Sequence, residues 1–152
     1  MIAYRSLFAL TLCAAALVGA AGCDEKLADV GGPTPGLAPT FAAIQRDIFQ
    51  STDSSGRVAC TQCHTTQGRT PPLGLSLLPD AAYQGLLNVP SAQKAGAIRV
   101  IPGDPDNSYL VQKLEGHSSI VGQRMPRTSG PFLTEGQMLI IRRWIAQGAA
   151  NN

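Results

Sequence analysis

Two cysteines and a histidine within five residues restrict what this chain can fold into more than any other feature. The sequence has four cysteines and two histidines, and Cys60, Cys63 and His64 stand together in the stretch Cys-Thr-Gln-Cys-His. Two thiols three positions apart in one helical turn point to the same side of the backbone, and the next residue places an imidazole beside them. A group bound by these three side chains therefore needs space inside the fold.

The spacing predicts covalent attachment of one haem c. The two thiols reach the two vinyl groups on one side of a porphyrin, and His64 then directs a ring nitrogen at the iron. Three alternatives remain open. A thioredoxin-like redox pair would need a strand–helix–strand context, which the flanking sequence does not offer. A tetrahedral zinc site would use Cys60, Cys63, His64 and His117, although adjacent side chains seldom point at one ion. The third alternative is a disulfide between Cys60 and Cys63.

A second axial ligand is expected from the part of the chain that follows the motif. His and Met together are a common ligand pair in electron carriers and raise the reduction potential. Met125 lies in an expected loop and precedes Pro126, whose ring stiffens that loop. Met138 lies on the apolar side of the last expected helix, which favours a core position. We therefore predict Met125 as the distal ligand and keep His117 as the alternative.

The N-terminal segment has the layout of a processing signal. Arg5 is followed by an apolar run at 7–18 and by small residues at 19–22 that end at Cys23. The run is too short to span a bilayer as a mature helix. We predict a signal peptide of the lipoprotein type at 1–22 and lipidation of Cys23, with ordinary cleavage and a free Cys23 thiol as the alternative. Residues 23–39 are rich in Gly and Pro and read as a flexible tether. The mature protein is then exported, on the periplasmic or extracellular side, and tethered to a membrane.

The remaining residues, 40–152, are expected to form one all-α domain of short helices and long loops. The apolar spacing predicts helices at 40–50, 80–87, 107–115 and 134–147. Thr134 and Gln137 have the spacing of a capping box, and Gly116 and Gly148 stand where helices would stop. Aromatic residues make up 5% of the chain, so a core of side chains alone lacks large fillers, and a bound apolar cofactor would take their place. The net charge of +2 gives no support for binding nucleic acid.

The haem motif, the Met125-Pro126 pair and a terminal amphipathic helix with an aromatic together resemble the class I-like monohaem bacterial cytochromes c, here of a membrane-tethered lipoprotein type. The resemblance covers about 40–150 and implies a cytochrome c-like domain around one haem. It implies that the first and last helices cross, so that Phe41, Ile44 and Ile48 meet Ile141, Trp144 and Ile145. It also implies that a carbonyl of Pro71 or Pro72 accepts a hydrogen bond from His64. The segment 75–105 departs from the minimal family pattern.

These features predict an exported one-electron carrier, and not an enzyme, with His64 and Met125 as axial ligands and Cys60 and Cys63 as thioethers. Its expected partners are redox proteins that dock transiently, and a membrane reached through the lipid anchor. Arg124 and Arg127, which flank Met125, are either partners for haem propionates or solvated charges. Two alternative functions remain: a haem-bearing subunit or domain of a larger periplasmic oxidoreductase, and a haem sensor or enzyme with a displaceable sixth ligand.

Overall fold

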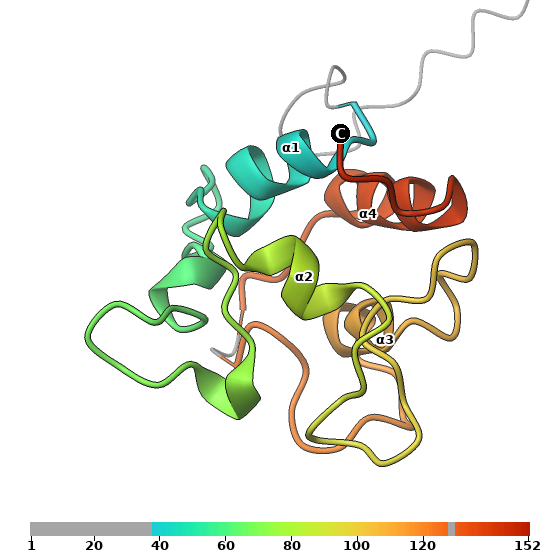
Figure 1. Cartoon of the computed structure of the whole chain (residues 1–152). Helices are drawn as coiled ribbons and strands as arrows, with labels where there is room; N and C mark the ends of the chain where they lie inside the picture. Colours follow the sequence, from blue (N-terminus) through green and yellow to red (C-terminus); the bar gives the residue numbers. More distant parts are fainter. Residues whose placement is uncertain (1–37, 128–129) are drawn as a thin grey trace, which may run out of the picture.

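A computed structural model describes residues 38–127 and 130–152, and in these residues the fold is helical, with no β-strand. The predicted signal peptide, the proposed lipid-bearing Cys23 and nearly all of the predicted tether lie outside the described residues. Within them, four α-helices are joined by long loops, and short 3₁₀ and π-helical turns lie between α1 and α2 (Figure 1). No helix of the described part is long and apolar enough to cross a membrane.

The first predicted helix is confirmed, and its second half is wider than an α-helix. Helix α1 spans Phe41–Ile44 and continues as the π-helical turn η1, Gln45–Phe49. The side chain of Thr40 caps the start by accepting a hydrogen bond from the Ala43 amide. The last residue of the chain adds a second cap, since the backbone and side-chain oxygens of Asn152 accept from the amides of Ala42 and Phe41.

Helix α4, Glu135–Ala146, is the longest element and begins with the predicted capping box. The Thr134 hydroxyl accepts from the Gln137 amide at 3.2 Å, while the Gln137 side chain accepts from the Thr134 amide at 3.0 Å. These two bonds satisfy backbone donors that an α-helix leaves unpaired at its start. The helix therefore begins where the sequence predicts.

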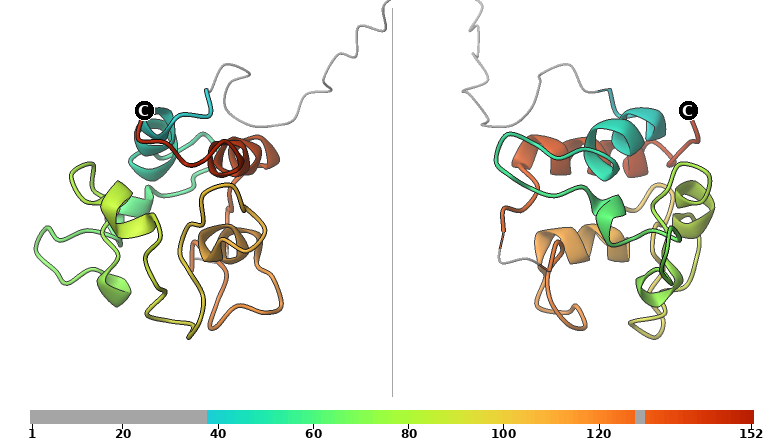
Figure 2. Two further views of the ribbon diagram at one scale, coloured as in Figure 1. Left: turned by 45° about the vertical axis from the view of Figure 1, so that its right-hand side comes forward. Right: turned by 90° about the vertical axis from the view of Figure 1, so that its left-hand side faces the viewer.

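Helices α1 and α4 pack against each other, as both views in Figure 2 show. The rings of Phe41 and Trp144 lie 5.4 Å apart between their centroids. The other apolar residues of the two predicted stripes are fully buried in the same cluster: Ile44, Ile48, Ile141 and Ile145. The expectation that these two stripes meet is confirmed, because each helix hides its apolar side only by covering that of the other.

Two shorter helices complete the domain. Helix α2 spans Ala82–Leu86, and helix α3 spans Tyr109–Glu115 and ends at Gly116, which has a φ of 78°. A side chain at this position would be strained, and its Cβ would also lie 2.8 Å from Arg124. The segment between α2 and α3 is held by single β-bridges, such as Leu87 with Val100 and Pro90 with Ile98. The segment 75–105, which departs from the family pattern, is therefore tied into the domain by these bridges.

Candidate functional site

The Cys-x-x-Cys-His motif forms a single tight turn. Cys60–Gln62 is a 3₁₀ helix, η2, and the amides of Cys63 and His64 both donate to the Cys60 carbonyl, at 3.2 and 2.9 Å. A 3₁₀ turn brings residues i and i+3 onto one side. The sequence prediction that the two thiols share one side of a helical turn agrees with this local geometry.

A cavity of about 610 Å³ opens beside this turn. Its volume falls within the range of about 300–1,000 Å³ that is usual for small-molecule and cofactor sites. Cys60, Cys63 and His64 line it together with Met125, which is more than sixty positions away in the sequence. Most of the remaining wall is apolar, with Phe49, Leu75, Leu77, Leu86, Leu110, Leu114 and Leu133.

His64 is partly buried, and its ring orientation is fixed by one backbone contact. Its Nδ1 lies 3.0 Å from the carbonyl oxygen of Leu75. A carbonyl can only accept, so Nδ1 carries the proton and Nε2 keeps a free lone pair. Burial lowers the pKa of His64, and the charge of Arg99 lowers it further, while the bond to Leu75 opposes them. The imidazole is therefore neutral at neutral pH, which is the form that ligates a metal.

The carbonyl that holds His64 is not one of those expected from the family resemblance. Pro71 and Pro72 were the two candidates, and that expectation is wrong. Their carbonyls accept from the amides of Gly74 and Leu75 in the 3₁₀ turn η3, Pro72–Gly74. The carbonyl of Leu75, the residue directly after this turn, faces the imidazole instead.

Cys60 and Cys63 are both free thiols, and their surroundings differ. Cys60 is half-buried, whereas Cys63 is exposed. Burial raises the pKa of the Cys60 thiol, although the nearby charge of Arg57 opposes this. The Cys60 Sγ lies 3.9 Å from Nη1 of Arg57 and 3.8 Å from the Ile48 carbonyl. Cys60 is thus the buried end of the pair, and Cys63 is the end open to solvent.

Met125 is presented to the cavity by a loop that is tied to α3. Its amide donates to the Lys113 carbonyl at 2.9 Å. The buried ammonium group of Lys113 donates to the carbonyls of Val121 and Gln123, and the Val121 amide donates to the Tyr109 hydroxyl at 3.0 Å. These bonds fix the loop on both sides of Gly122, so the thioether has a defined place.

The other candidate ligands lie elsewhere. His117 is exposed, its Nε2 lies 2.8 Å from Glu115 Oε2, and it does not line the cavity. Met138 is buried in the hydrophobic core, as its place on the helix predicts. In residues 38–127 and 130–152 no group of three or more His, Cys, Asp or Glu side chains could hold a metal ion, so the zinc alternative has no support there.

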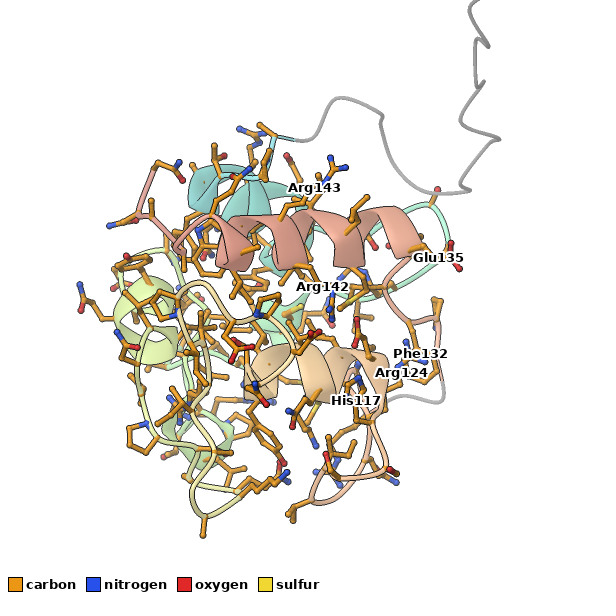
Figure 3. The ribbon with its side chains drawn as sticks, turned by 90° about the vertical axis from the view of Figure 1, so that its right-hand side faces the viewer. His117, Arg124, Phe132, Glu135, Arg142 and Arg143 are labelled. Carbon is orange, nitrogen blue, oxygen red and sulfur yellow. The ribbon has the colours of Figure 1, made fainter. Side chains whose placement is uncertain are left out.

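The two arginines beside Met125 point in different directions. Arg127 lines the cavity, and its Nε lies 3.3 Å from Gln123 Oε1. Arg124 donates to the Leu114 carbonyl at 2.7 Å, and its guanidinium lies 3.9 Å from the centre of the Phe132 ring, as Figure 3 illustrates. Arg124 is thus a structural contact of α3. Trp144 also belongs to the core, whereas Tyr109 is buried and lines the cavity.

Of the charged residues in the cavity wall, the sequence pointed only to Arg127 and missed the other four. Five cationic residues line the cavity, and none of the described residues that do so is acidic. They are Arg57, Arg69, Arg99, Lys113 and Arg127. They come from five separate places in the chain, so no local motif marks them. The cavity combines apolar walls with positive charge, which suits an apolar ligand that carries carboxylates.

Comparison of the chain with protein-family models, curated proteins and solved structures finds no match.

Proposed function

We propose that this chain is an exported one-electron carrier that holds one haem c in a cytochrome c-like domain. One observation carries the proposal: a single cavity collects Cys60, Cys63, His64 and Met125. Cys60, Cys63 and His64 are neighbours in the sequence, so the informative part is that Met125, more than sixty positions later, lines the same apolar cavity. The four residues supply the groups that thioether attachment and His/Met axial ligation require.

The residues of the cavity fit this group in their chemistry. The apolar walls match the faces of a macrocycle, and the cations match its two propionates. A haem held there supplies one-electron oxidation and reduction, at a potential that depends on axial ligands, hydrogen bonds and burial.

Each ligand residue is supported by a second contact. The Leu75 carbonyl orients the His64 ring and keeps its Nε2 free to ligate. Lys113 braces the loop that carries Met125. Thioethers at Cys60 and Cys63 would keep the group from dissociating, which matters for an exported protein. With both axial positions filled by protein, the chain would exchange electrons with docked partners and would not bind small molecules.

The spectrum of the pyridine-treated protein tests the proposal. The full chain is produced in an exporting host that has a haem c maturation system. We expect the spectrum of haem attached through two thioethers, and loss of one linkage in Cys60→Ser or Cys63→Ser. Cys23→Ser is the matched control, because it changes a cysteine outside the motif and should keep both linkages. Absence of covalent haem from the wild-type chain would refute the proposal.

Carbon monoxide distinguishes the carrier from a haem sensor or enzyme. The reduced carrier should leave its spectrum unchanged on exposure to the gas, because Met125 occupies the sixth position. Rapid formation of a carbon monoxide complex would favour the displaceable-ligand alternative. Stable co-purification of an enzyme subunit under mild detergent would favour the alternative that the chain belongs to a larger oxidoreductase.

The exported location and the lipid tether remain predictions of the sequence. Metabolic labelling with a radioactive fatty acid would test the anchor. We expect label on the wild-type chain and none on Cys23→Ser, with the haem content unchanged.

A further inference from the structure

A fully buried guanidinium lies beside the Cys60 thiol, and neither the haem motif nor the axial ligands account for it. The side chain of Arg57 has no solvent exposure, and it lines the cavity. Its Nε forms an ion pair of 2.9 Å with Oδ2 of Asp53. Burying an ion pair costs desolvation energy and is weak evidence for a purely stabilising role.

The guanidinium joins the motif to the end of the first helix. Its Nη1 donates to the carbonyls of Ile48 and Val58, both at 3.2 Å, and lies 3.9 Å from the Cys60 Sγ. Its Nη2 donates to the Ser51 carbonyl at 3.2 Å. The Arg57 side chain therefore links the end of η1 and the residues before the motif to the Cys60 thiol.

Asp53 holds the other end of the pair away from the cavity. Its carboxylate accepts from the amide of Ser55 at 3.0 Å, and it lies 3.5 Å from Nε2 of Gln137 at the start of α4. Burial opposes ionisation of Asp53, but hydrogen bonds from Ser55 and Arg57 outweigh it, so the pKa of Asp53 lies below its ordinary value. Arg57 lines the cavity and Asp53 does not, so the pair turns its positive end toward the cavity.

We propose that the Asp53–Arg57 ion pair positions Cys60 for thioether attachment and sets the reduction potential of the attached group. This rests on the proposed function. Reduction lowers the charge of the iron by one, so a nearby positive charge favours the reduced state and a nearby negative charge favours the oxidised state. The effect is large in a buried setting, where water screens little.

The test compares the reduction potentials of three variants with that of the wild-type holoprotein. Asp53→Asn leaves Arg57 unbalanced, and we expect the midpoint potential to rise. Arg57→Met leaves the carboxylate, and we expect the potential to fall and a smaller fraction of the chain to carry haem. The double variant removes both charges, and its potential should lie between those of the single variants. The midpoint of thermal unfolding of each holoprotein is measured alongside.

The exposed ion pair Arg46–Asp47, in the turn η1 just before the loop that holds Asp53 and Arg57, provides a matched control. Its Nη2–Oδ2 distance is 2.6 Å, and the side chain of Arg46 is 71% exposed. Arg46→Met and Asp47→Asn should leave the potential unchanged, because solvent screens them. Arg57→Lys keeps the positive charge but loses most of the hydrogen bonds that the guanidinium donates. It should lower the midpoint of thermal unfolding, while its reduction potential stays closer to wild type than that of Arg57→Met.

The outcomes separate this inference from the proposed function. A wild-type chain without covalent haem would overturn both. A wild-type chain with haem, and variants at Asp53 and Arg57 that shift the potential no more than the Arg46 and Asp47 variants, would overturn this inference alone. A fall in potential in Asp53→Asn would also overturn it. If Arg57→Met does not accumulate, Asp53→Asn and Arg57→Lys decide the matter.

Discussion

At the scale of single residues, the site depends on which polar groups face the cavity and which face away from it. His64 and Met125 face it, whereas His117 pairs with Glu115 on the surface and Met138 lies in the core. Two histidines and three methionines in the sequence thus reduce, among the described residues, to one candidate of each kind at the site.

Replacement of Met125 tests the distal ligand. In Met125→Ala we expect a lower midpoint potential or a high-spin haem, because the thioether that favours the reduced state is gone. His117→Ala should leave the spectrum unchanged. The measurement is the absorption spectrum of both oxidation states, including the weak far-red band of a methionine–ferric iron bond. The opposite pattern in the two variants would identify His117 as the ligand.

Replacement of Arg99 tests whether the segment 75–105 stabilises the part of the site around His64. Its guanidinium donates to the carbonyls of Gly85 and Leu73, at 2.7 and 2.9 Å, and Leu73 lies close to the Leu75 carbonyl that holds His64. We expect Arg99→Met to lower the free energy of unfolding of the holoprotein by about 1.5–3 kcal/mol, as is usual for hydrogen bonds from a charged donor. Denaturant unfolding measures this. The exposed Arg143 of α4 serves as the control, and an equal loss in Arg143→Met would argue against the bracing role.

At the scale of secondary-structure elements, the crossing of α1 and α4 organises the domain. The two helices bury their apolar sides on each other, and the Arg142 side chain connects α4 to Glu115 of α3 at 3.0 Å and also pairs with Asp106 (Figure 3). The loops that line the cavity connect these helices to one another.

Replacement of Trp144 tests how much the packing of α1 against α4 contributes to stability. Trp144→Ala should lower the free energy of unfolding by about 3–5 kcal/mol, because it opens a cavity where the indole packs on Phe41. The control is Leu139→Ala on the same helix, since Leu139 is 45% exposed and should cost little. Chemical denaturation of the holoprotein gives both values, and similar losses would mean that the crossing is not the main source of stability.

The hydrogen bonds that Asp53 accepts from Ser55 and Arg57 predict a loss of stability in acid. The folded pKa of Asp53 is lowered, so its contribution is present above the unfolded pKa and is lost as the pH falls through the folded one. The relevant range is below about pH 4, the ordinary aspartate pKa. The free energy of unfolding of Asp53→Asn should therefore depend less on pH in this range than that of the wild type. Parallel pH profiles of the two proteins would contradict the prediction.

At the scale of the whole molecule, the cavity lies where several loops meet helix α3. The motif turn, the segment after α2 and the loop of Met125 all meet around a space of about 610 Å³. Without a group to fill that space, these loops have few partners on the inside.

The chain without its cofactor should therefore lack a stable tertiary structure. In the double variant Cys60→Ala, Cys63→Ala, expressed without haem, we expect weak near-ultraviolet circular dichroism and no cooperative thermal transition. The wild-type holoprotein, treated in the same way, is the reference. Native-like helicity with a sharp melting transition in the variant would contradict the prediction.

Local patterns in the sequence determined the helices, their caps and the motif turn. The apolar spacing, the Thr134–Gln137 box and the stop at Gly116 all correspond to features of the structure within a few residues. These predictions depend on interactions between near neighbours, which the sequence contains directly. The sequence also predicted the meeting of α1 and α4, although there a family resemblance was needed to choose the pairing.

Only the tertiary structure decided which distant groups share the cavity. The Leu75 carbonyl, and not that of Pro71 or Pro72, faces the His64 ring, while the two proline carbonyls accept from amides of a 3₁₀ turn. The five cations come from five places in the chain. Asp53 and Arg57 are only four residues apart, but the tertiary structure decided that their ion pair is buried beside Cys60. Such placements depend on how loops close over a space, and no short-range pattern encodes that. The motif at Cys60 to His64 is thus a property of the sequence, and the site around it is a property of the fold.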